Sequence, residues 1–246
     1  MTAAAPRSSQ PLPPTPARRR IYLMRHGNVT YFDDQGRPYP PDSVPLNDEG
    51  EAQANAAGQL FAQHRVTFDR VIVSGLPRTV QTAQRVLAQT GQQIELEYWP
   101  ELEELKGGKL SQIRDDELKN AFISAFEGLV GEQRRFLGGE SIGELLDRVL
   151  PCISRLRAAP SWDTVLLVLH GGVNRAILSH ALTSQRLFMG GLAQSAGCIN
   201  ILDVGADATD WVVRMVNLAP LRYLQDGTRE TTMETLWNQY RTARGL

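Results

Sequence analysis

Residues 19–27, with the sequence RRIYLMRHG, are a short apolar run that ends at a histidine and a glycine, His26 and Gly27. Such a run is typical of a buried β-strand, whose carboxyl end then presents the histidine. The same pattern returns in residues 164–172, TVLLVLHGG, where the apolar run ends at His170. Because open α/β sheets bind ligands at the carboxyl ends of their strands, we expect the two strands to place both histidines side by side.

Strand and helix patterns alternate along the rest of the chain. Strands are expected at 69–73, 94–98, 198–204 and 211–216, and helices at about 48–64, 78–90, 111–128, 141–159, 173–182 and 232–242. The last two strands are joined by a short polar turn, which predicts an antiparallel hairpin. This order of elements predicts an α/β fold, a three-layer α/β/α sandwich with a mixed, mostly parallel central sheet.

The chain is long enough for one α/β domain with a large core. We expect a single domain over residues 19–246, with a helical insert at about 105–140. Residues 1–18 are rich in Pro, Ala and Ser and contain no apolar segment. They therefore predict a disordered N-terminal tail rather than a signal peptide.

The bulk composition argues against two classes of partner. A formal net charge of -1 over 246 residues disfavours nucleic-acid binding, which needs a basic surface. No apolar run is as long as a membrane span, so no membrane association is expected. The two cysteines, Cys152 and Cys198, are far apart and lack metal-ligand spacing, which favours a reducing, cytoplasmic setting. These features do not predict the oligomeric state.

Charged side chains follow two further strands. Arg78 begins the helix after the strand at 69–73, and the segment 101–104, after the strand at 94–98, is rich in glutamate. An arginine beside the free N–H groups of a helix N-terminus makes a good anion site. A solvated surface is the alternative interpretation of each charged residue taken alone, but their convergence with two histidines at one sheet edge favours a common site.

Two arginines and two histidines predict a phosphoryl group as the bound anion. The fixed charge of Arg25 beside His26 disfavours a divalent cation, and the chain has no His-Glu-x-x-His sequence, so neither a metal nor another cofactor is expected. Arginine grips phosphate oxygens in a bidentate manner. A neutral imidazole can take the phosphoryl group covalently, and a carboxylic acid can protonate the leaving oxygen.

A serine motif offers a different enzyme class. Residues 139–143, GESIG, match the G-x-S-x-G pattern of serine hydrolases, which requires a strand directly before the serine. The preceding segment 134–137 is short and basic instead. Ser141 and Glu144 also have the spacing of a helix capping box, and we favour a cap over a serine nucleophile.

Four segments resemble motifs of the histidine phosphatase superfamily, also called phosphoglycerate-mutase-like. They are Leu23–Gly27, Ser74–Ala83, Gly138–Ser141 and Leu169–Gly172, and the resemblance spans about residues 20–205. It implies that His26 is the phosphorylated nucleophile. It also implies that Arg25 and Arg78 bind phosphate and that His170 contacts the phosphoryl group.

The proton donor follows from the same resemblance. The family pattern places this acid two residues after a leucine and four before a glycine. Leu102 and Gly108 give the role to Glu104, with Glu103 as the alternative. Asn28 stands where the family commonly has Glu or Gln, and it is a further candidate phosphate ligand.

Departures from the family pattern bear on the reaction. Phe32 stands where an asparagine often helps to hold phosphate, and residues 110–112 replace the Trp-Glu-Gly that often follows the acid. Segments typical of cofactor-dependent mutases are missing. The resemblance thus implies a metal-independent phosphatase that hydrolyses a small phosphomonoester through a phosphohistidine at His26. A phosphoglycerate-type mutase and a non-catalytic module that binds phospho-ligands are the alternatives.

Two segments are expected to decide substrate specificity. The polar, proline-rich loop 28–45 should overhang the site. The segment 106–137 carries basic side chains that either meet a second acidic group of the substrate or are solvated: Lys106, Lys109, Arg114, Arg134 and Arg135.

Overall fold

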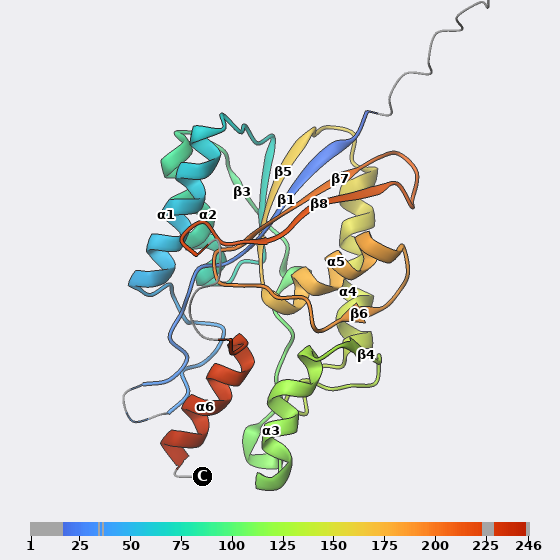
Figure 1. Ribbon diagram of the computed structural model, residues 1–246. Coiled ribbons are helices and arrows are strands. Elements are labelled where there is room, and N and C mark those ends of the chain that lie inside the picture. The colour runs from blue at the N-terminus through green and yellow to red at the C-terminus, as the bar shows by residue number, and fades with distance from the viewer. Residues whose placement is uncertain (1–16, 34, 36, 223–228, 245–246) are drawn as a thin grey trace, which may run out of the picture.

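The computed structural model describes residues 17–33, 35, 37–222 and 229–244, so the tail predicted at residues 1–18 lies almost entirely outside the described residues. A six-stranded sheet forms the middle of the molecule, in the order β3-β2-β5-β1-β7-β8 (Figure 1). Its strands are β1 (Arg19–Arg25), β2 (Arg70–Val73), β3 (Leu96–Tyr98), β5 (Thr164–Leu169), β7 (Ile199–Val204) and β8 (Trp211–Leu218).

The sheet is mixed and mostly parallel, as predicted. β1 pairs with β5, β5 with β2 and β2 with β3 in parallel, whereas β7 and β8 form the predicted antiparallel hairpin beside β1. The registers Met24↔Val168 and Arg25↔Leu169 align the ends of β1 and β5. The residues that follow these two strands therefore lie next to each other.

Helices cover both faces of the sheet, which confirms the three-layer prediction. Figure 1 shows α1 (Asp48–Gln63) and α2 (Pro77–Thr90) on one side, and α4 (Ile142–Ala158) and α5 (Gly171–Thr183) on the other. Along β5, Leu166 and Val168 join the core under α1 and α2, whereas Val165, Leu167 and Leu169 join the core under α4 and α5. A strand covered on both faces requires the continuous apolar run seen in the sequence.

Side-chain caps define two helix starts. The Asn47 side chain accepts a hydrogen bond from the Gly50 N–H (2.9 Å) and begins α1 as expected. Ser141 Oγ accepts from the Glu144 N–H (3.1 Å), while Glu144 Oε2 accepts from the Ser141 N–H (2.7 Å). This capping box confirms the structural interpretation of Ser141, whose hydroxyl serves the α4 N-terminus.

The helix predicted at 111–128 was wrong in its extent. The segment is divided into the 3-10 turns η2 (Leu110–Gln112) and η3 (Ser124–Phe126) with α3 (Asp115–Ile123) between them. Arg114 has extended backbone angles, and three acidic residues then form the first turn of α3, where the helix dipole favours negative charge. Another 3-10 turn, η1 (Pro100–Leu102), follows β3. The two-residue strands β4 (Leu129–Val130) and β6 (Phe188–Met189) pair separately and were not predicted.

α3 and α6 (Thr232–Arg244) lie beyond the carboxyl ends of the strands, at the bottom of Figure 1. Leu118 and Phe122 of α3 pack against Tyr240 of α6 in a small apolar cluster. Phe32 joins this cluster, with its ring 6.3 Å from that of Tyr240. The phenylalanine that replaces the family's asparagine therefore packs loop 28–45 against α6. None of the helices in the described ranges is long and apolar enough to cross a membrane.

Core packing leads to a stability prediction for Leu167, which is fully buried in β5. The change Leu167→Ala should lower the free energy of unfolding by about 2–5 kcal/mol, because it removes methyl groups and leaves a cavity. The matched control is Leu129→Ala, at a side chain that is 71% exposed, and it should change stability by less than about 0.5 kcal/mol. Denaturant titration of both variants measures the difference, and equal losses would contradict the core assignment.

Candidate active site

His26 is the first residue after β1 and is 1% exposed. Its backbone N–H donates to the Leu169 carbonyl (2.9 Å), which links the ends of β1 and β5. The ring Nδ1 lies 2.7 Å from the Gly27 carbonyl oxygen. Because a carbonyl only accepts, Nδ1 carries the hydrogen and the neutral ring has its lone pair on Nε2. Nε2 is therefore the nitrogen available as a nucleophile.

His170 follows β5 and is the N-cap residue of α5. Its ring centroid lies 5.2 Å from that of His26, so the structure places the two predicted histidines together. The Nε2 atom of His170 is 2.8 Å from Ser74 Oγ, which is in turn 3.1 Å from Thr79 Oγ1. Since the Thr79 hydroxyl donates to the Leu76 carbonyl, the Ser74 hydroxyl donates to Thr79 and His170 Nε2–H donates to Ser74. The lone pair of the neutral His170 ring is then on Nδ1.

Arg25 and Arg78 are also buried, at 8% and 2% exposure. One terminal nitrogen of each guanidinium donates to a main-chain carbonyl, that of Arg25 to Gln194 (2.5 Å) and that of Arg78 to Pro41 (2.6 Å). Within the described part of the chain, Nε of both arginines is buried without a hydrogen-bond partner, as is Nδ1 of His170. Buried polar atoms are normally satisfied, and unsatisfied cationic donors are the pattern expected of an anion site.

Burial and positive charge act on both histidines. The pKa of His26 is lowered well below its ordinary value, first by burial and then by the charges of Arg78 and Arg25, with the bond to Gly27 opposing the shift. The pKa of His170 is lowered in the same direction by burial, then by His26 and both arginines. Both rings are therefore neutral near pH 7. An anion bound among them would raise both pKa values, because negative charge stabilises the protonated ring.

Glu104 reaches the site from the loop after η1. Its Oε1 and Oε2 accept from the Gly172 N–H at 3.0 and 3.2 Å, at the N-terminus of α5. A methyl group placed on Gly171 would lie 3.6 Å from Arg25 Nε and 3.7 Å from Glu104 Oε2, so the carboxylate and the guanidinium both lie against this glycine. Glu103 instead pairs with Lys106 (3.4 Å). Of the two candidate acids, the structure brings Glu104 to the cationic site.

Asn28 lies beside this group and has other partners. Its side-chain nitrogen donates to Glu49 Oε2 (2.6 Å), and its side-chain oxygen accepts from the Val29 N–H (2.9 Å). With Arg25 and His26 it lines a cavity of about 390 Å³ between loop 28–45 and α6. Phosphate binding by Asn28 stays a prediction.

The five basic residues singled out in segment 106–137 are exposed. Three of them pair with carboxylates: Lys106 with Glu103, Arg114 with Asp116 and Arg135 with Glu144. Exposure and these ion pairs agree with the solvated alternative, and contact with a second acidic group of the substrate stays a prediction.

Arg175 is a further charged residue near the site that the sequence patterns did not single out. It lies one helical turn after Gly171 and donates to the carbonyls of Gly171 (3.0 Å) and Gly190 (2.9 Å). Burial, followed by the charge of Arg25, lowers the pKa of Arg175 to about 10, and Glu104 opposes the shift. The sequence did contain a clue to Arg175. It lies four residues after Gly171 in a predicted helix, and residues four apart lie on the same face of a helix.

No group of three His, Cys, Asp or Glu side chains that could hold a metal occurs among residues 17–33, 35, 37–222 and 229–244.

Comparison with known proteins identifies the family that the motifs resemble. The family model described as "Histidine phosphatase superfamily (branch 1)" matches residues 21–218. A curated relative from Salmonella paratyphi A, named "Probable phosphoglycerate mutase", is 32% identical over 154 residues, which cover 62% of this chain and 69% of the relative.

Two solved structures have the same fold. Mycobacterial glucosyl-3-phosphoglycerate phosphatase in complex with VO3 is 25% identical with a TM-score of 0.62, covering 81% of this chain and 99% of the other. The alpha-ribazole phosphatase of Shigella flexneri is 24% identical with a TM-score of 0.62, covering 80% and 96%.

The neutral histidines predict a pH dependence of stability. The folded protein holds both pKa values below 6.5, so the unfolded chain binds more protons when the pH falls through that value. The free energy of unfolding should therefore drop from about pH 6.5 downwards, by at most about 1.4 kcal/mol per pH unit for each histidine. Denaturant titrations between about pH 7.5 and pH 4.5 measure this slope. The double variant His26→Gln/His170→Gln should flatten it, and an unchanged slope would contradict the assignment.

Proposed function

The chain belongs to the histidine phosphatase superfamily, and from that premise we propose that it is a metal-independent phosphatase that hydrolyses a small phosphomonoester. One observation carries the proposal: the lone pair of His26 lies beside Arg25, Arg78 and His170, and each of these three has a buried polar atom without a hydrogen-bond partner among the described residues. The oxygens of a phosphoryl group can accept from Nε of both arginines, and from Nδ1 of His170 once that ring is protonated. The negative charge of the group matches the two guanidinium groups.

In the first step, Nε2 of His26 attacks phosphorus and forms an N–P bond while the ester P–O bond breaks. The electron pair stays on the ester oxygen, which takes a proton from the carboxyl group of Glu104. Arg25 and Arg78 stabilise the charge on the transferring oxygens. His170, whose pKa rises when the anion binds, is protonated on Nδ1 and donates to the same group.

In the second step, water attacks the phosphohistidine. Glu104, now a carboxylate, accepts the proton from this water, and His26 leaves as the neutral ring. Inorganic phosphate is then the product. The relative of known structure that is named as a phosphatase and binds VO3 supports hydrolysis, since it is 25% identical over 81% of this chain.

A mutase is the second candidate, because a relative that is 32% identical is named as a phosphoglycerate mutase. In that reaction, the phosphohistidine would return its phosphoryl group to a second hydroxyl rather than to water. Incubation with a phosphoglycerate and analysis of the products separates isomerisation from phosphate release.

The nucleophile assignment predicts that His26→Ala lowers kcat for p-nitrophenyl phosphate by at least about 10³-fold, since loss of a nucleophile costs far more than loss of a binding contact. The matched control His180→Ala changes a histidine of α5 that contacts Trp211, and it should keep wild-type activity. A rapid alkaline SDS quench, which preserves the acid-labile N–P bond, should trap a phosphoenzyme from the wild type with ³²P-labelled substrate, whereas His26→Ala should form none. A wild-type rate in His26→Ala would overturn the proposal, and absence of any turnover or phosphoenzyme in the wild type would favour a binding module.

The approach of Glu104 to α5 gives a further prediction. A methyl group at Gly172 would lie 2.6 Å from Glu104 Oε1, so Gly172→Ala forces the carboxylate to move while the fold is kept. We expect kcat for an alkyl phosphate to fall by about 10²-fold, the scale of a misplacement of about 1 Å. Gly131→Ala is the control, because a methyl group there has no heavy atom within 4 Å. Equal activity of the two variants would contradict the role of Glu104.

A further inference from the structure

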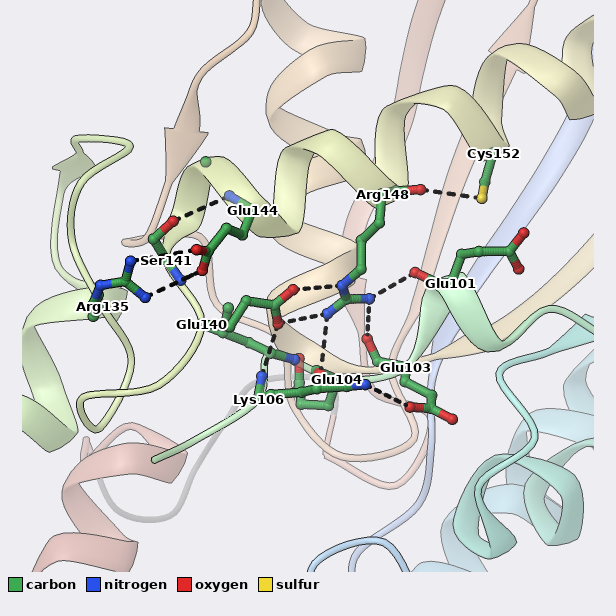
Figure 2. A network of polar contacts seen from close by, with 12 residues as sticks. Glu101, Glu103, Glu104, Lys106, Arg135, Glu140, Ser141, Glu144, Arg148 and Cys152 are labelled. Atoms are coloured by element: carbon green, nitrogen blue, oxygen red, sulfur yellow. Dashed lines mark hydrogen bonds and ion pairs between the residues drawn. The ribbon is translucent and has the colours of Figure 1, made fainter. Parts of the chain in front are cut away.

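The backbone of the Glu104 loop is held by one side chain from a different element. Arg148 lies on α4 and points into the loop after η1 (Figure 2). Its Nη1 donates to the carbonyls of Glu101 (2.6 Å) and Glu103 (2.7 Å), and its Nη2 donates to the carbonyl of Glu104 (3.2 Å). Three main-chain carbonyls within four residues therefore converge on a single guanidinium.

The remaining donors of Arg148 go to Glu140. Nε donates to Glu140 Oε1 (2.6 Å) and Nη2 to Oε2 (2.8 Å), a bidentate ion pair whose side chains are 20% and 11% exposed. A guanidinium has five N–H donors, and all five are used here. An arginine with every donor directed at a partner holds those partners in one geometry, which a lysine cannot reproduce.

Glu140 also holds the backbone on the C-terminal side of Glu104, at Lys106. Its Oε2 accepts from the Lys106 N–H (2.9 Å), and its own N–H donates to the Lys106 carbonyl (2.8 Å). A methyl group on Gly139 would lie 2.4 Å from the Lys106 carbonyl oxygen, so the two backbones are in direct contact. The loop is thus held on both sides of Glu104, at 101–104 by Arg148 and at 106 by Glu140.

Every hydrogen bond of the Arg148 side chain goes to the loop or to Glu140, and none goes to Arg25, His26, Arg78 or His170. Its charge is the last of the causes that lower the pKa of His170, and Arg148→Lys keeps that charge. We propose that Arg148, held by Glu140, is the positioning residue for the proton donor: it sets the backbone from which Glu104 reaches the Gly172 N–H and the leaving oxygen. This inference rests on the proposed function, in which Glu104 gives its proton to the ester oxygen as the P–O bond breaks.

The chemistry of the leaving group tests this role. An alkoxide is too basic to leave without a proton, whereas 2,4-dinitrophenolate leaves readily without one. A misplaced Glu104 therefore slows transfer from an alkyl phosphate much more than transfer from 2,4-dinitrophenyl phosphate. General structural damage would slow both reactions, because both use His26, Arg25 and Arg78.

We expect Arg148→Lys and the double variant Arg148→Met/Glu140→Met to lower kcat for glycerol 2-phosphate by about 10²-fold, within the range of general acid catalysis. For phosphoenzyme formation from 2,4-dinitrophenyl phosphate, the rate should fall less than about threefold. The double variant removes both charges together, so it leaves no unpaired buried carboxylate in a protein that must still fold. Thermal unfolding verifies that each variant is folded.

Two reference variants complete the experiment. Glu104→Gln should show the same leaving-group dependence as Arg148→Lys. Arg155→Met removes an arginine of α4 that contacts the Glu101 side chain (3.2 Å) rather than loop carbonyls, and it should keep both rates. Equal losses on both substrates in folded Arg148 variants, with leaving-group dependence in Glu104→Gln, would overturn the positioning role and leave the proposed function intact. Absence of a phosphoenzyme in the wild type would overturn both.

Discussion

Buried positive charge is the constraint on which the rest of this site depends. Arg25 and Arg78 give up most of their hydration at the carboxyl edge of the sheet, and main-chain carbonyls replace only part of it. The same charges, together with burial, keep His26 and His170 neutral. One arrangement thus favours an anion and leaves a lone pair on His26, the proposed nucleophile. In the proposed mechanism, binding of the phosphoryl group and activation of the nucleophile therefore have a common electrostatic origin.

The Glu104 carboxylate is held in a different way from the two arginines. Glu104 lies close to the cationic groups yet forms its hydrogen bonds with backbone N–H groups, chiefly that of Gly172 at the start of α5. A helix N-terminus stabilises a negative charge without a salt bridge, and this favours the carboxylate that Glu104 becomes after the first step of the proposed mechanism. The loop that carries Glu104 has no regular structure between η1 and η2, so the contacts of Arg148 and Glu140 replace the hydrogen bonds that a helix or strand would supply.

Local patterns were sufficient for much of the fold. The apolar runs before His26 and His170 predicted two buried neighbouring strands, because a strand covered on both faces needs side chains that are apolar throughout. The cap at Ser141 was also correctly predicted, since a cap involves only three or four consecutive residues. The helix predicted at 111–128 failed because apolar spacing continued across Arg114, where the backbone is extended.

The sequence by itself determined that His26, His170 and Arg78 gather at the sheet edge, since strand ends and helix starts are local properties and parallel pairing brings them together. Only the tertiary structure decided how those side chains are held. Arg25 meets a carbonyl 169 residues away, and Arg148 meets the carbonyl of Glu104, 44 residues away. Every residue type has the same backbone carbonyl, so no pattern of residue types reveals which carbonyl a distant arginine will contact.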